Sequence, residues 1–146
     1  MKCPACANEL TPFPVCNLLV DACQGGCGGI WFDAFELQRV DEEHEVAGEP
    51  LVNIQHKEGL VVDRSRKREC PRCAGIKLQR HFFSARRRIE VDECPSCGGC
   101  WLDAGELALI RAERSHAAAA AQAAQGGISV EVIRYVYRLR TQQPRS

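Results

Sequence analysis

The segment VDECPSCGGCWLDAGEL at residues 91–107 decides the fold that the sequence predicts. The segment VDACQGGCGGIWFDAFEL at residues 20–37 repeats it almost position by position. A Cys-x2-Cys turn precedes each segment, as CPACA at residues 3–7 and as CPRCA at residues 70–74. Because so many positions match in the same order, the chain contains two copies of one small unit.

The cysteine content sets the class of protein, since ten cysteines in 146 residues is far above average usage. Met1 and Lys2 lead directly into Cys3 without an apolar leader. No apolar stretch approaches the ~18 residues of a membrane span. We therefore expect a cytoplasmic protein with no membrane partner, in which reduced thiols favour metal binding over a framework of five disulfides.

Each copy spaces four cysteines as a zinc site does. The second copy has two Cys-x2-Cys pairs, whereas the second pair of the first copy is Cys-x3-Cys, where Gly25 and Gly26 can absorb the extra residue. Four thiolates suit a tetrahedral Zn²⁺ and leave no position for water or substrate, so we expect two zinc ions per chain and no enzymatic activity. The predicted ligands are Cys3, Cys6, Cys23 and Cys27 in the first copy and Cys70, Cys73, Cys94 and Cys97 in the second.

Two cysteines remain outside these sets. Cys100 matches Ile30 in the first copy, so we predict that it packs among apolar residues. Cys16 has no counterpart and is predicted to pack in a hairpin, or to replace Cys23 as a ligand if that side chain cannot reach the metal. Iron in a rubredoxin-like site and a thiol–disulfide couple are the alternative uses of such cysteines, and four paired motifs in tandem favour a metal over a single redox couple.

Each copy also predicts a β-hairpin followed by a short helix. Apolar and charged residues alternate over residues 88–92, which is the period of a strand. Asp33 and Asp103 are predicted N-caps, because each has a glutamate three residues later in a variant of the capping box. Trp31 and Trp101 precede these caps by two residues and are predicted to cover the metal sites as buried anchors.

The repeat and its flanking segments predict four parts. These are a first ribbon with its helix at residues 1–47, a linker with a short β segment at 48–67, a second ribbon with an alanine-rich helix at 68–125, and a C-terminal tail at 126–146. Gly126 and Gly127 are predicted to end the alanine-rich helix. Residues 128–140 fit either a helical face or a strand, and we favour the helix.

The string at residues 92–107 resembles the prokaryotic zinc-ribbon family named for transcription factor IIB, and the resemblance extends over residues 1–40 and 68–110. The first copy departs from the pattern in its longer second turn and in Phe35, where Gly105 stands in the second copy. The resemblance implies a rubredoxin-like zinc β-ribbon and zinc binding. Together with the residue patterns, it predicts a small, metal-stabilised α+β fold with two such ribbons, each followed by a helix, and a helical C-terminal tail. A role in transcription or nucleic-acid binding is implied by the family's name alone.

Charge is distributed unevenly, although the net charge is zero. Residues 1–63 carry three Lys/Arg and eleven Asp/Glu, whereas residues 64–88 carry ten Lys/Arg and one Glu. This basic segment predicts nucleic-acid binding through phosphate contacts and base stacking. A zinc-stabilised adaptor that binds a protein partner or associates with itself, without nucleic acid, is the alternative. The candidate nucleic-acid contacts are Arg64, Arg66, Lys67, Arg68, Lys77, Arg80, Phe82, Phe83, Arg86, Arg87 and Arg88.

Overall fold

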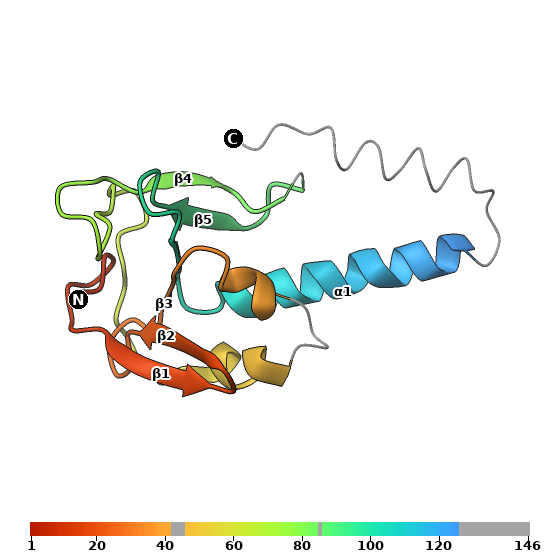
Figure 1. The fold of residues 1–146 in the computed structure, drawn as a ribbon, viewed down its shortest axis with the longest axis horizontal. Helices are drawn as coiled ribbons and strands as arrows, with labels where there is room; N and C mark the ends of the chain where they lie inside the picture. The colour runs from red at the N-terminus through yellow and green to blue at the C-terminus, as the bar shows by residue number, and fades with distance from the viewer. Residues whose placement is uncertain (42–45, 85, 126–146) are drawn as a thin grey trace.

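The computed structural model describes residues 1–41, 46–84 and 86–125, which form a six-stranded antiparallel sheet and one α-helix (Figure 1). The helix, α1, spans Glu106–Gln125. The strands are β1 Thr11–Val15, β2 Leu18–Ala22, β3 Ile30–Phe32, β4 Gln79–Phe82, β5 Glu90–Glu93 and β6 Cys100–Leu102.

The strand order β1-β2-β3-β6-β5-β4 shows how the two copies meet. Each copy contributes a hairpin and one further short strand, and the two copies join where β3 pairs antiparallel with β6. Trp31 and Trp101 are direct partners in this central register. The two ribbons therefore share one continuous sheet, with the junction between the copies at its centre.

The tryptophans are exchanged between the copies at this junction. Both indoles are fully buried. A Cβ atom added at Gly99 would lie 2.2 Å from Cζ2 of Trp31, and one added at Gly29 would lie 2.2 Å from Cζ2 of Trp101. The second glycine of each Cys-Gly-Gly motif therefore leaves room for the tryptophan of the other copy. Both indoles lie in one buried cluster with cysteines of both copies, which agrees with the prediction that they are buried anchors beside the metal sites.

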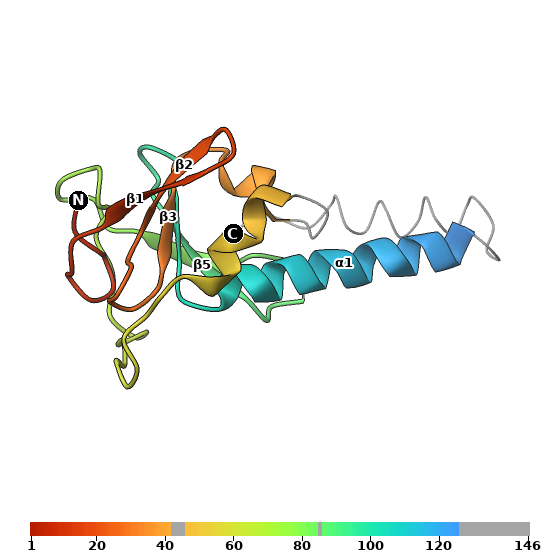
Figure 2. The ribbon, with the colours of Figure 1, turned by 90° about the horizontal axis from the view of Figure 1, so that it is seen from below.

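A larger apolar core lies beside the sheet and is closed by the first turns of α1. Leu107 and Ile110 of α1 are buried with Leu51 of the 3-10 turn η3, which spans Pro50–Asn53. Figures 1 and 2 both show the remainder of α1 projecting away from the strands. Alanine supports this part of the helix by its intrinsic propensity, because few large side chains are present to pack. The helix reaches Gln125, as the sequence predicts.

The helix expected after the first ribbon is replaced by the 3-10 turn η1, Leu37–Arg39. The next residue, Val40, is fully buried, and its carbonyl accepts a hydrogen bond from Arg111 Nη1 of α1 at 2.7 Å. Arg114 also pairs with the buried Asp41 at 2.6 Å. Because of these contacts, the chain after η1 packs against α1 and does not continue as a helix.

The linker also differs from the sequence-based expectation. Within the described part of residues 48–67, the regular elements are the end of η2, Val46–Gly48, and the turn η3, in place of a β segment. Pro50 suits the start of a 3-10 turn because it has no N–H to leave unpaired. His56 makes only an isolated bridge to Gly26. The expected tail at 126–146, including the helix favoured for 128–140, lies outside the described residues.

Each predicted capping box forms on its glutamate side only. Glu106 Oε2 accepts the backbone N–H of Asp103 at 2.7 Å, and Glu36 Oε2 accepts that of Asp33 at 2.9 Å. Because α1 begins at Glu106, Asp103 lies before the N-cap position. The prediction that Asp103 caps this helix is therefore wrong. The aspartate carboxylates have other partners, which are described with the metal centres.

The tryptophan exchange makes a direct prediction. Gly99→Ala should lower the free energy of unfolding by about 1–3 kcal/mol, because the added methyl group overpacks a buried site. It should also increase quenching of tryptophan fluorescence by acrylamide. The control is Gly75→Ala, which has open space and a φ of +76° and so carries only the left-handed backbone cost of about 1–2 kcal/mol. Equal quenching in the two variants would contradict the exchange.

Candidate metal centres

The first predicted set of cysteines converges on one point. The sulfur atoms of Cys3, Cys6, Cys23 and Cys27 all lie within 4.8 Å of one another. Cys3 and Cys27 are 3.5 Å apart at sulfur, and Cys6 and Cys23 are 3.4 Å apart. The longer Cys-x3-Cys turn thus brings its two sulfurs into the cluster.

Two glycines make that longer turn possible. Gly25 takes a φ of +72°, which glycine adopts without strain. A Cβ on Gly26 would lie 2.5 Å from the sulfur of Cys23, so a side chain there would collide with the cluster. Cys23 reaches the cluster itself, and Cys16 lies exposed in the hairpin turn between β1 and β2 at a φ of +49°. The alternative in which Cys16 replaces Cys23 is therefore not supported, and the prediction that Cys16 packs in the hairpin is wrong, because the residue is exposed.

The second set forms an equivalent cluster from Cys70, Cys73, Cys94 and Cys97. Cys70 and Cys97 are 3.8 Å apart at sulfur. The backbone N–H of Cys73 donates to Cys70 Sγ at 3.3 Å, and that of Cys97 donates to Cys94 Sγ at 3.4 Å. The N–H groups of the turn therefore point at the sulfurs and stabilise their thiolate forms.

Both donor sets fit Zn²⁺. A tetrahedron with Zn–S bonds of about 2.3 Å places its sulfurs ~3.8 Å apart. The second cluster has this separation, and the first is slightly tighter. Sulfur-only sets with four ligands are typical of closed structural zinc sites. When bound, the ion would act as a cross-link between the two turns of each ribbon.

The electrostatics of the clusters also call for a cation. The hydrogen bond from Cys3 lowers the pKa of Cys27 to about 6, and the same bond, with burial, raises the pKa of Cys3 well above its ordinary value. Burial, the largest effect, raises the pKa of Cys70 to about 12. At Cys94 burial is outweighed by hydrogen bonds from backbone N–H groups, and the pKa falls to about 7. Without a metal ion, the crowded sulfurs therefore keep protons that they share in hydrogen bonds. A bound divalent cation displaces these protons and stabilises all four sulfurs as thiolates.

Cys100 lies outside both clusters. It belongs to β6, pairs with Phe32 of β3 and packs against the larger apolar core. Burial raises the pKa of its thiol to about 12, so the thiol stays protonated at neutral pH. This agrees with its predicted role as a small packing residue.

Each tryptophan is tied to an aspartate, and each aspartate is held by an arginine. Trp31 Nε1 donates to Asp33 at 3.1 Å, and Trp101 Nε1 donates to Asp103 at 3.1 Å. Arg72, between two predicted ligands of the second cluster, crosses to the first copy and binds Asp33 with two nitrogens. Sequence reasoning missed this contact. The one signal for it in the sequence is that Arg72 occupies the position at which the first copy has the uncharged Ala5.

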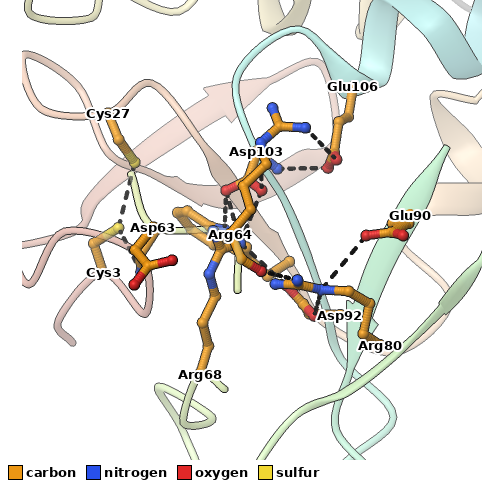
Figure 3. A network of polar contacts seen from close by, with 12 residues as sticks. Cys3, Cys27, Asp63, Arg64, Arg68, Arg80, Glu90, Asp92, Asp103 and Glu106 are labelled. Carbon is orange, nitrogen blue, oxygen red and sulfur yellow. Dashed lines mark hydrogen bonds and ion pairs between the residues drawn. The ribbon is translucent and has the colours of Figure 1, made fainter. Parts of the chain in front are cut away.

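Arg68 takes the corresponding role in the second copy. Its Nη1 atom lies 2.8 Å from Asp103 and 3.1 Å from Asp92, and the residue is only 3% exposed (Figure 3). The prediction that Arg68 contacts nucleic acid is therefore wrong, because its side chain is buried. Its charge is matched inside the protein, where an unpaired charge would be costly.

Three other candidate contacts are also partly used within the fold. Lys77 pairs with Glu69 at 3.0 Å, and Arg80 pairs with Asp92 at 3.0 Å. Phe83 packs against the apolar core. Lys77 and Arg80 nevertheless remain exposed. The other exposed candidates are Arg64, Arg66, Lys67, Phe82, Arg86, Arg87 and Arg88, of which Arg64 lies 3.9 Å from Asp103.

A family model described as transcription factor zinc-finger matches the chain twice, at residues 2–43 and 69–112. The two matches together cover more than half of the chain, and each contains one cysteine cluster. No curated protein and no solved structure gives a significant match. The family and the two clusters support zinc binding by this chain.

We predict two zinc ions per chain, because each cluster has four sulfurs at zinc-binding separations. Elemental analysis of protein purified without added metal measures this stoichiometry. A value near one would show that the longer turn of the first ribbon does not hold zinc, and iron in place of zinc would overturn the choice of metal.

We further predict that Cys94→Ser unfolds the second ribbon, and with it the sheet that the two ribbons share, whereas Cys100→Ser does not. A structural zinc contributes about 10–16 kcal/mol to a small domain at neutral pH, which is comparable with the ~5–15 kcal/mol stability of a whole domain. Cys100 lies outside the cluster, so its loss costs only packing. Zinc content and far-UV circular dichroism report both effects. Equal loss of zinc from the two variants would refute the ligand assignment.

Proposed function

Because the chain belongs to the transcription factor zinc-finger family, we propose that it is a zinc-stabilised module that binds nucleic acid without strong sequence preference. The zinc sites are closed by four sulfurs each, so their role is to hold the ribbons in shape. Binding is assigned to exposed cations of the second ribbon. The described part of the chain contains no helix long and apolar enough to cross a membrane.

The observation that carries this proposal is a set of exposed cations without internal partners. Arg86, Arg87 and Arg88 lie at the tip of the β4–β5 hairpin and are all exposed. No carboxylate in the described ranges pairs with any of them. Arg66 and Lys67 are likewise exposed and form no direct ion pair within those ranges, although Arg66 interacts electrostatically with the exposed Asp63. We call these five residues the basic ridge.

The fold brings the two parts of the basic ridge to the edge of the sheet that β4 forms. Arg80 of β4 donates to the backbone carbonyl of Arg64, so the loop that carries Arg66 and Lys67 lies beside β4. The other three cations follow β4 along the hairpin, at the end of the sheet opposite β1 (Figure 1). Exposed cations gathered near one edge strand suit the phosphates of a nucleic-acid backbone.

The hairpin presents an aromatic ring and is held firmly. Phe82 is 40% exposed and can stack on an unpaired base. Ser84 donates to Glu113 of α1, and the guanidinium of Arg114 lies 5.9 Å from the centre of the Phe83 ring. These contacts fix the hairpin against α1, so that the exposed arginines project from a supported tip.

Replacing Arg86, Arg87 and Arg88 together with alanine should weaken nucleic-acid binding and leave zinc content unchanged. Non-specific binding has a dissociation constant of about 10⁻⁴–10⁻⁶ M at physiological salt, and each lost phosphate contact removes ~0.9 from the slope of log K against log salt for duplex DNA. The measurement is an anisotropy titration with labelled DNA and RNA oligomers at several salt concentrations.

Lys77→Ala is the matched control, because it removes a cation of the same ribbon that is already paired with Glu69. It should change the salt slope little. If the unmodified protein binds no oligomer at low salt, the proposed function is wrong, and an adaptor without nucleic-acid binding becomes the better reading.

A further inference from the structure

The sheet has two edges, and the chain treats them differently. At one edge, β1 carries Pro12 and Pro14, which pair in register with Asp21 and Leu19 of β2. Because proline has no N–H, these residues occupy the alternate positions of β1 whose nitrogens face away from β2. The outer side of β1 therefore lacks donors at both positions and is closed to a further strand.

At the other edge, the outward-facing positions of β4 retain their donors. The backbone N–H of Phe83 donates to the Ile89 carbonyl at 2.7 Å, which fixes the hydrogen-bonded positions of the β4–β5 ladder. Hydrogen-bonded and non-hydrogen-bonded pairs alternate along an antiparallel ladder. His81 therefore bonds inward to β5, whereas Arg80 and Phe82 direct their backbone groups outward.

These outward groups are available in the structure. The outward N–H of Leu78, just before β4, donates to the carbonyl of Arg68 at 2.8 Å, so the chain's own segment covers the edge up to that point. In the ranges that the structure describes, the next outward N–H groups, of Arg80 and Phe82, donate no hydrogen bond. The carbonyl of Phe82 contacts Nδ1 of His81 at 3.1 Å, which leaves one of its lone pairs free. An edge strand with unpaired backbone groups is a template for a further strand.

The surroundings of this edge indicate the chemistry of that strand. The basic ridge flanks β4 on both sides along the chain, so acidic side chains would be attracted. The 40% exposed ring of Phe82 offers an apolar contact to a facing side chain. We propose that the β4 edge binds an extended acidic peptide segment of a partner protein, which adds a seventh strand to the sheet.

A second copy of the chain fits this edge less well. Pairing of two β4 strands would bring two basic ridges together, and like charges in close contact are destabilising. The peptide proposal does not rest on nucleic-acid binding, because it uses the backbone donors of β4 in addition to the cations. The two proposals can therefore fail separately.

The probe is a short fluorescein-labelled peptide in which glutamate alternates with valine, titrated into the full-length zinc-loaded protein. Two further peptides carry N-methyl groups, one on the glutamate amides and the other on the valine amides. An added strand bonds through alternate residues only. One methylated peptide should therefore bind at least about tenfold more weakly than the parent peptide, corresponding to ~1.4 kcal/mol, and the other should not.

The substitution Phe82→Pro tests the same backbone contact by changing the protein instead of the peptide. It removes an outward N–H as Pro12 and Pro14 do in β1, and it removes no ladder bond to β5. Phe82→Ala is the matched control, since it also loses the ring but keeps the N–H. The proline variant should bind the peptide at least about tenfold more weakly than the alanine variant. Oligonucleotide binding should be equal in the two variants.

Zinc content and circular dichroism show whether Phe82→Pro is folded. Amide hydrogen exchange of the unmodified protein gives a second test that needs no variant, because the peptide should slow exchange at Arg80 and Phe82. Equal binding of the two methylated peptides, unchanged exchange at these amides, or a dimer that forms in place of the peptide complex would each overturn the proposal.

Discussion

The exchange of tryptophans between the two ribbons is the contact on which the rest of the structure depends. Trp31 occupies the space above Gly99, Trp101 occupies the space above Gly29, and the strands that carry both rings pair at the centre of the sheet. A ribbon of about 40 residues buries too little surface to be stable without a metal or a partner. Here each copy supplies the other's missing core, and the cysteine clusters hold the turns on either side.

The same arrangement decides how the positive charge of the middle segment is used. Arg72 and Arg68 hold aspartates that accept hydrogen bonds from the tryptophan indoles, so these two cations belong to the junction between the copies. The cations of the basic ridge have no such task among the described residues and face solvent. The basic segment is therefore divided into an internal part and an external part, and only the external part can recognise a partner.

Much of this fold is predictable from the repeat, and its limits have physical causes. Cysteine spacing is a local property, so the two sets of four sulfurs and the paired glycines of the longer turn follow from the chain. The fate of Arg68 depends on Asp92 and Asp103, which are distant in sequence, and its burial cannot be read from a run of charges. The 3-10 turn that replaces the helix expected after the first ribbon likewise depends on a distant contact, the hydrogen bond from Arg111 to the carbonyl of Val40. Tertiary contacts override local preference in both cases.

The central claim is that the two ribbons form one cooperative unit, because neither copy retains its core without the other. Stepwise removal of zinc with a chelator, followed by far-UV circular dichroism and tryptophan fluorescence, tests it most directly. The structure predicts a single transition in which both signals change together as the sheet is lost. Two separate transitions, with one ribbon remaining folded after the other has lost its zinc, would contradict the account.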